Sequence, residues 1–155
     1  VGGSFSGQKI EGLRELLDLK GMKVYANKHE AHGLQRVTGI SDSDIVKVES
    51  GDQLKVGNVE IDFLHTPGHT PGSQCFRVKD ALVSGDTLFL QGCGRVDLPG
   101  GSVDEMERTL TQRLAKLPDD LVLYPGHAYG GEHAPLGEVR RTNPFLQGDL
   151  RRWLG

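Results

Sequence analysis

Three residues whose side chains suit metal binding or proton transfer each follow a predicted strand. His69 lies in a loop with two Pro-Gly steps, directly after the alternating apolar pattern of residues 58–63. Asp86 follows the apolar run 81–84, and His127 follows the run 121–124. Imidazole nitrogen and carboxylate oxygen are ligands that suit zinc or non-haem iron. Residue type alone favours a structural role for each residue, and a joint site requires three strand ends to meet at one edge of a sheet.

The segments that carry these residues resemble those of a known family. They read TPGHTPGS at 66–73, SGDTLF at 84–89 and YPGH at 124–127. In this order and spacing they resemble the second half of the metallo-β-lactamase superfamily, and within it the glyoxalase II-like and persulfide-dioxygenase-like proteins. The resemblance covers nearly the whole chain. It implies that His69 binds a first metal, that Asp86 is the catalytic carboxylate shared by two metals, and that His127 binds the second.

The main metal motif of that superfamily, His-x-His-x-Asp-His, does not occur in the sequence. Relatives typically carry a residue and two glycines after this motif, and the chain begins Val1-Gly2-Gly3. We therefore expect residues 1–155 to be a single domain that is incomplete at its N-terminus. Each metal would keep two of its ligands, fewer than the three or four of a stable zinc site. This predicts weak or absent metal binding and little activity for these residues alone, both restored by a supplied N-terminal segment.

A second informative loop, residues 91–97, contains the sequence CGRVD. It resembles the CGR-x-D segment of persulfide-dioxygenase-like proteins, and in glyoxalase II-like relatives a basic residue at the position of Arg95 contacts glutathione. Tyr129 matches an aromatic residue that lines the same pocket. From the residues alone, an internal ion pair of Arg95 with Asp97 or Asp86 is an equal alternative to substrate binding. Cys93 is expected to pack within the loop, because nothing nearby in the sequence supplies a base to activate it.

The resemblance and the missing metal motif leave three alternative functions open. The first is a hydrolase with two zinc ions per intact site that acts on a thioester or ester, including glutathione-derived substrates. The second is a mononuclear-iron persulfide dioxygenase, whose 2-His-1-carboxylate site would use His69, Asp86 and one missing histidine. The third is a truncated, non-catalytic binding module. It would expose an apolar sheet face and form a homodimer or exchange strands.

Composition restricts the partners. The net charge of −3 provides no basic face for nucleic acid and no polybasic membrane anchor. No apolar run approaches the roughly 20 residues needed to cross a bilayer. The two cysteines, Cys75 and Cys93, have no CxxC spacing, which is typical of a reduced, cytoplasmic setting. A small-molecule substrate is the partner that the resemblance implies.

The elements that must position the site are predicted from hydrophobic periodicity. It predicts a helix over 8–19, a short helix from Lys28 that Gly33 ends or interrupts, and a helix over 103–117 that opens with a Ser102–Glu105 capping box. Terminal helices are expected over 136–141 and 144–153, and strands over 23–26, 45–48, 53–56, 59–63, 73–79, 81–84 and 121–124. This order favours an α/β or α+β fold, and the resemblance implies the C-terminal portion of an αββα sandwich.

Overall fold

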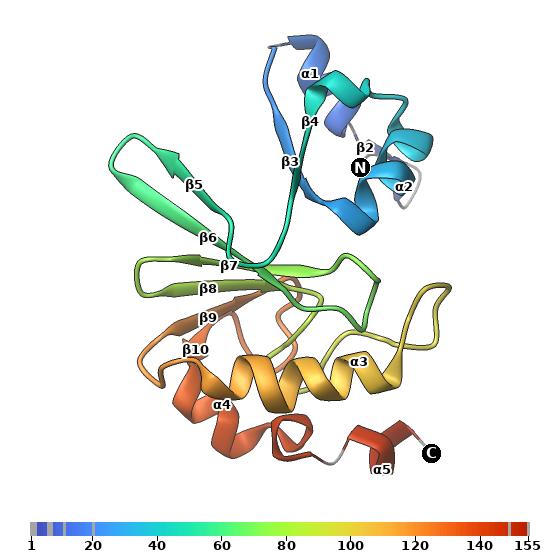
Figure 1. Ribbon diagram of the computed structural model, residues 1–155. Helices are drawn as coiled ribbons and strands as arrows, with labels where there is room; N and C mark the ends of the chain where they lie inside the picture. The colour runs from blue at the N-terminus through green and yellow to red at the C-terminus, as the bar shows by residue number, and fades with distance from the viewer. Residues whose placement is uncertain (1–2, 6–7, 11, 20, 149, 155) are drawn as a thin grey trace. The chain divides into compact units, whose positions relative to one another are not determined.

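A computed structural model of the chain describes residues 3–5, 8–10, 12–19, 21–148 and 150–154 (Figure 1). The chain forms two compact units, residues 1–48 and 49–155. Each unit is described by itself. The expectation of a single domain stays a prediction.

The first unit combines short strands with two helices. Strands β1 (Gly3–Phe5) and β2 (Gln8–Ile10) pair antiparallel, and β3 (Val24–Asn27) pairs parallel with β4 (Ile45–Val48). The remaining elements are α1 (Leu13–Leu19), α2 (Lys28–Thr38) and η1 (Asp42–Asp44). A small apolar core of Ala26, Ala31, Ile40 and Ile45, with Leu13 and Leu17 packed against it, joins α1, α2, β3 and β4.

Two helix predictions in this unit were wrong in extent. Residues 8–10 pair with β1 as a strand, so α1 begins only at Leu13. At the start of this helix, the backbone N–H of Gly12 donates to the Glu15 carboxylate at 3.0 Å. Gly33 neither ends nor interrupts α2, which continues to Thr38. Gly39 ends it in the left-handed conformation (φ 68°), because a glycine carries no side chain to oppose that geometry.

The second unit contains a six-stranded sheet with the order β10-β9-β8-β7-β6-β5. Neighbouring strands are antiparallel except β8 and β9, which are parallel. The strands are β5 (Gln53–Val56), β6 (Val59–His65), β7 (Gln74–Val78), β8 (Ala81–Gly85), β9 (Val122–Pro125) and β10 (Ala134–Pro135). The predicted hairpin at Gly57-Asn58 is confirmed, since Val56 pairs with Val59. Strands β6, β8 and β9 are the ones that precede His69, Asp86 and His127.

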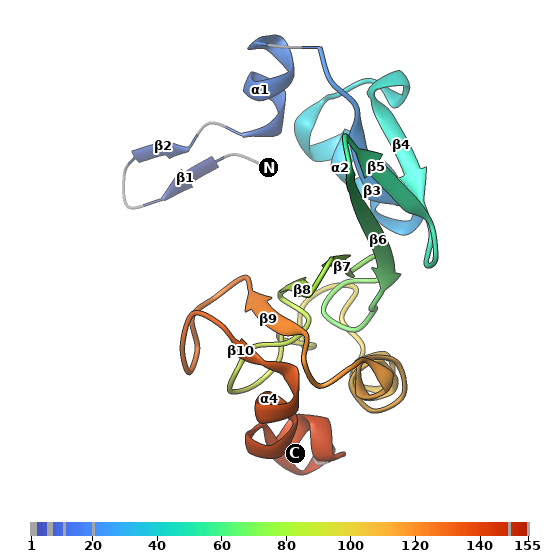
Figure 2. The same cartoon turned by 90° about the vertical axis from the view of Figure 1, so that its left-hand side faces the viewer.

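Helices cover one face of this sheet. They are α3 (Val103–Arg108) with its continuations η2 (Thr109–Arg113) and η3 (Leu114–Lys116), α4 (Leu136–Thr142), η4 (Pro144–Gln147) and α5 (Leu150–Leu154). Figure 1 shows α3 and α4 on the same side of the sheet, and Figure 2 shows α4 on that side from another direction. The core between them includes Leu82 and Leu123 from the sheet and Met106, Leu110 and Leu136 from the helices. This is the helix-covered sheet expected for half of a sandwich.

The helical segment after Ser102 agrees with its prediction. The Ser102 hydroxyl accepts from the backbone N–H of Glu105 at 3.3 Å, and helical turns continue to Lys116. The turn widens to π-helical geometry at Thr109, whose buried hydroxyl donates to the carbonyl of Pro67 at 2.7 Å. The single helix predicted over 144–153 was wrong, because Gly148 adopts φ 90° and separates η4 from α5.

The opposite face of the sheet is apolar and partly exposed. Leu82 and Leu123 are completely buried, whereas their neighbours Val83 and Tyr124, which pair across β8 and β9, are 40% and 42% exposed. Alternation along a strand explains the contrast, since successive side chains point to opposite faces.

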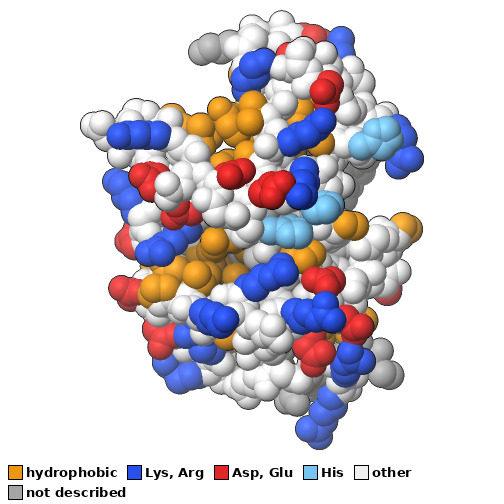
Figure 3. Space-filling view, viewed as in Figure 1, with side chains coloured by type: hydrophobic (Ala, Val, Ile, Leu, Met, Phe, Trp, Pro, Cys, Tyr) orange, Lys and Arg blue, Asp and Glu red, His pale blue; other side chains and the backbone are white. Residues whose placement is uncertain are grey.

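The surface carries mixed charges. On the face shown in Figure 3, Lys and Arg side chains are interspersed with Asp and Glu. No helix in the described part of the chain is both long enough and apolar enough to span a membrane.

Candidate metal and substrate site

A cleft of about 420 Å³ lies at the edge of the sheet where β6, β8 and β9 end. Its lining includes all five residues predicted from the sequence: His69, Asp86, Arg95, His127 and Tyr129. The structure therefore brings together side chains from three motifs that are distant in the sequence.

Asp86 lies between the two histidines. Its Oδ2 is 3.8 Å from Nε2 of His69, and its Oδ1 is 3.4 Å from Nε2 of His127. Two ligand atoms bound at about 2.1 Å to one tetrahedral ion are about 3.4 Å apart, so these separations fit a carboxylate that shares one ion with each histidine. Among the described residues, no group of three or more His, Cys, Asp or Glu side chains is arranged to hold a metal ion. The donors present fit part of a two-metal site.

The orientation of the His69 ring follows from its Nδ1 nitrogen. Nδ1 lies 2.7 Å from the carbonyl oxygen of Arg95, which can only accept a hydrogen bond. Nδ1 therefore donates this hydrogen bond, and in the neutral imidazole Nε2, which faces Asp86, is the nitrogen left to bind a metal. Metal-binding histidines are commonly oriented by such a bond to a backbone carbonyl.

The residues that flank α3, Ser102 and Thr109, support the loop that carries His69. The backbone N–H of Ser102 donates to the carbonyl of Gly68 at 2.8 Å, and Thr109 holds Pro67. Across the base of the loop, the N–H of Thr66 donates to the carbonyl of Ser73 at 2.8 Å. The loop is thus fixed at its base and against the helix.

Two glycines allow the backbone to approach Asp86 closely. A Cβ at Gly94 would overlap the carbonyl oxygen of Asp86, and a Cβ at Gly126 would lie 2.6 Å from its Oδ1. Sequence reasoning did not assign these roles. The glycine content of the sequence, 22 of 155 residues, was the available signal, but close approach of two chain segments leaves no local pattern.

Aromatic rings surround His127, whose side chain is 55% exposed. The ring of Tyr129 stacks on it at 5.5 Å, and the ring of Phe89 meets both edge-on, at 5.8 Å from His127 and 5.1 Å from Tyr129. Phe89, the last residue of the SGDTLF segment, was not predicted as a site residue. It is buried and forms the floor beneath the two exposed rings.

Arg95 forms the ion pair that was one of its two predicted alternatives. Its Nε and one terminal nitrogen contact the two carboxylate oxygens of Asp97 at 2.9 and 2.8 Å. This hydrogen bonding raises the pKa of the Arg95 guanidinium and lowers the pKa of the Asp97 carboxyl. Both side chains are exposed beside the cleft, so the substrate role of Arg95 stays a prediction.

Cys93 packs against the core of the second unit, as expected for a residue of the loop rather than a nucleophile. Burial raises the pKa of its thiol to about 11, so the thiol is protonated near neutral pH. His65, near the end of β6, also has a loop role, with Nε2 2.8 Å from the carbonyl oxygen of Pro71.

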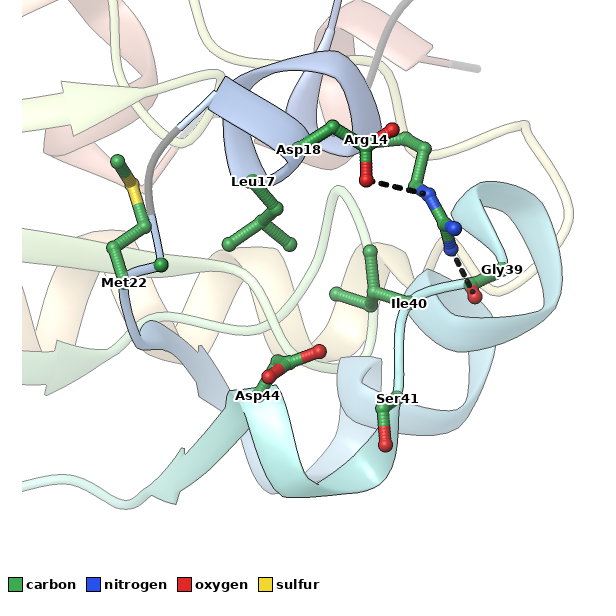
Figure 4. A pocket seen from close by; sticks show the side chains of 9 residues that line it. Arg14, Leu17, Asp18, Met22, Gly39, Ile40, Ser41 and Asp44 are labelled. Atoms are coloured by element: carbon green, nitrogen blue, oxygen red, sulfur yellow. Dashed lines mark hydrogen bonds and ion pairs between the residues drawn. The ribbon is translucent and has the colours of Figure 1, made fainter.

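The first unit contains a separate hollow of about 320 Å³ (Figure 4). At its rim Arg14 forms an ion pair with Asp18 at 3.5 Å and donates to the carbonyl of Gly39 at 2.9 Å. Leu17, Met22 and Ile40 add apolar surface. These interactions connect α1 to the end of α2, so the polar groups at the rim have a structural role.

Comparison with known proteins decides the family. The model of the metallo-beta-lactamase superfamily matches residues 10–127. The chain belongs to this superfamily. The chain is 44% identical to a hydroxyacylglutathione hydrolase of Polaromonas sp. over 122 residues, which cover 76% of the chain. The match covers 43% of that relative.

Solved structures of the superfamily share the fold. A metallo-beta-lactamase from Staphylococcus aureus superposes with a TM-score of 0.73 at 29% identity, covering 86% of the chain and 44% of that structure. ETHE1 from Myxococcus xanthus superposes with a TM-score of 0.65 at 25% identity, covering 90% and 73%. The expected fold and the resemblance to the glyoxalase II-like and persulfide-dioxygenase-like branch are confirmed. The chain spans about half the length of the curated relatives it matches.

Proposed function

We propose that this chain contributes one part of the active site of a metal-dependent hydrolase that acts on a thioester or ester, with a glutathione-derived compound as the substrate class. His69, Asp86 and His127 are the metal-binding residues in this proposal, and Arg95 and Tyr129 bind the substrate. Membership of the superfamily and 44% identity to a hydroxyacylglutathione hydrolase support the reaction class. The free thiols of Cys75 and Cys93 support the proposal of a reduced, cytoplasmic setting.

The observation that carries the proposal is the position of Asp86 between two imidazoles. Each carboxylate oxygen faces the Nε2 of a different histidine, and Nδ1 of His69 is already committed to Arg95. A carboxylate that bridges two cations needs this divergent arrangement, because each oxygen then shares a different ion with one imidazole.

The residues of the cleft have separate tasks in this reaction. Bound divalent cations supply Lewis acidity and lower the pKa of a coordinated water. Asp86 would hold both ions and offset their mutual repulsion, while the carbonyl of Arg95 keeps the ring of His69 oriented. The guanidinium of Arg95 offers two parallel N–H groups that match a substrate carboxylate, which would displace Asp97 from this pairing. Tyr129 and Leu98 add apolar surface for the rest of the substrate.

Metal analysis tests the proposal. We expect the 155-residue chain alone to bind zinc weakly, because it provides two ligands per ion. A chain preceded by a segment with the His-x-His-x-Asp-His motif should bind two zinc ions and hydrolyse a hydroxyacyl-glutathione thioester. Asp86→Asn should abolish both properties. Asp120→Asn, the same chemical change at an exposed carboxylate, should affect neither.

The same measurement distinguishes the oxidative alternative. The CGRVD loop that borders the cleft, with Cys93 and Arg95 in its lining, favours a persulfide dioxygenase as the second candidate. One iron per chain together with oxygen consumption in the presence of glutathione persulfide would establish that reaction in place of hydrolysis. Absence of bound metal in every form of the chain would overturn both enzymatic proposals.

A non-catalytic alternative is supported by the partly exposed apolar face of the sheet. Val56, Val83 and Tyr124 are each at least 40% exposed there. We propose a second copy of the chain as the occupant of this face if the chain acts as a binding module. Light scattering tests this: a dimer that Val83→Lys converts to a monomer supports it, and a monomeric unmodified chain contradicts it.

A further inference from the structure

We propose that Asn143 is a positioning residue that holds both candidate metal-binding histidines in place through a single turn of the chain. This inference deepens the proposed function, since it concerns the residues assigned to the metal there. It rests on a buried side-chain amide that sequence analysis did not single out.

Asn143 is fully buried and its side-chain polar atoms are hydrogen-bonded. Its Nδ2 donates to the carbonyl of Phe89 at 3.0 Å and to the carbonyl of Gly92 at 2.9 Å. Its Oδ1 accepts from the N–H of Phe145 at 3.1 Å. Burying an amide without partners costs free energy, so this satisfied amide stabilises one arrangement of the segments that it joins.

The two carbonyls belong to one tight turn. The backbone N–H of Phe89 donates to the carbonyl of Gly92 at 3.1 Å, which closes residues 89–92. The Asn143 side chain donates a hydrogen bond to the first and to the last residue of this turn. The turn lies more than fifty residues from Asn143 in the sequence, so the contact ties the C-terminal helices to the wall of the cleft.

Each end of the turn leads to one histidine. At the first end, the ring of Phe89 packs edge-on against His127 at 5.8 Å and against Tyr129 at 5.1 Å. At the other end, the chain continues through Cys93 and Gly94 to Arg95, whose carbonyl oxygen orients His69. A shift of the turn would therefore displace the support of both imidazoles together.

Thiol labelling of the full 155-residue chain tests this arrangement without any metal. Cys93 lies next to the turn and is partly buried, whereas Cys75 is fully buried in the core. Asn143→Asp keeps the shape and the acceptor but removes both N–H donors, and Asn143→Ala removes the whole amide. We expect both variants to alkylate Cys93 about tenfold faster at fixed pH, with Cys75 unchanged, as read by mass spectrometry of the labelled peptides. Gln147→Ala, which removes an exposed side-chain bond in the same segment, should leave both rates unchanged.

Two results would overturn the proposal. One is a Cys93 rate that does not change. The other is an equal increase at Cys75 and Cys93, which would show global loosening. If neither variant folds, the unmodified chain decides by NMR: the Asn143 side-chain N–H protons should exchange slowly with solvent and show cross-peaks to residues 89–93, and rapid exchange would overturn it.

Zinc binding tests the step from the turn to the histidines. In the chain preceded by a segment with the His-x-His-x-Asp-His motif, Asn143→Asp should weaken zinc binding about tenfold or more, as removal of outer-shell support commonly does, and Gln147→Ala should not. Equal zinc affinity in Asn143→Asp would overturn the role toward the histidines. Failure of the chain that carries the N-terminal metal motif to bind zinc would count against the proposed function, while the labelling of Cys93 would still decide whether Asn143 holds the turn.

Discussion

The hydroxyl oxygens of Thr66 and Thr87 lie 3.0 Å apart in the interior of the protein. Thr66 follows β6 in the loop that carries His69, and Thr87 follows Asp86 at the end of β8. Both residues are at most 1% exposed. Their hydrogen bond joins two of the three motif loops in the interior, so the relative position of His69 and Asp86 depends on a buried polar contact.

Substitution of either threonine by valine should destabilise the fold. Thr66→Val or Thr87→Val leaves the partner hydroxyl short of a hydrogen bond in the interior, at a cost of about 1–3 kcal/mol in the free energy of unfolding. The double variant should lose less than the sum of the two single losses, because it leaves neither hydroxyl behind. Urea unfolding of the four proteins measures this coupling, and strictly additive losses would contradict it.

A methyl group at Gly94 should disrupt the cleft. Gly94→Ala places a Cβ against the carbonyl of Asp86, and the backbone must shift to accept it. We expect a loss of at least about 2 kcal/mol in the free energy of unfolding, since overpacking of this kind is among the costly classes of substitution. Gly33→Ala is the matched control. A Cβ at Gly33, inside α2, meets no atom within 4 Å, and alanine is favoured in helices by up to about 1 kcal/mol. Equal unfolding midpoints for the two variants would refute the steric argument.

Alkaline pH should destabilise the chain through Cys75. Burial raises the pKa of its thiol from 9.0 to about 11. The stabilising contribution is complete below pH 9 and is lost as the pH rises toward 11, because the unfolded chain releases the proton first. A pKa difference of two units corresponds to roughly 2–3 kcal/mol in the free energy of unfolding. Between pH 8 and 11, the free energy of unfolding measured with urea should fall less for Cys75→Ala than for the unmodified chain. Equal pH dependence in the two proteins would disprove the contribution of Cys75.

Arg95 should affect substrate binding more than stability. Its ion pair with Asp97 is exposed, so Arg95→Ala should leave the urea midpoint unchanged. If the guanidinium binds a substrate carboxylate, KM for a hydroxyacyl-glutathione thioester should rise about tenfold in the metal-loaded protein. Asp97→Asn, which removes the competing carboxylate, should leave KM equal or lower. A higher KM for Asp97→Asn would indicate that the ion pair itself shapes the site.

The elements were most predictable where local periodicity dominates. Strands β5 to β9 and the helical segment after Ser102 agree with alternation, turn and capping signals that act over a few residues. The errors concern residues 8–10, Gly33 and residues 144–153. At 8–10, pairing with β1 replaces the helical pattern, and at Gly33 the packing of Ala31 in the core of the first unit offsets the low helix propensity of glycine. At Gly148 the left-handed backbone divides a pattern that reads as one helix.

By itself, the sequence determined which donors are available, where strands end beside them, and to which superfamily they belong. Alternation and Pro-Gly turns are local, so they place His69, Asp86 and His127 at strand ends without reference to the rest of the chain. Tertiary structure alone decided that the two carboxylate oxygens of Asp86 diverge toward two imidazoles, that the carbonyl of Arg95 orients His69, and that Asn143 underlies the turn between them. These relationships join segments separated by tens of residues through backbone carbonyls and close contacts at glycine, and such contacts leave no periodic trace in the order of amino acids.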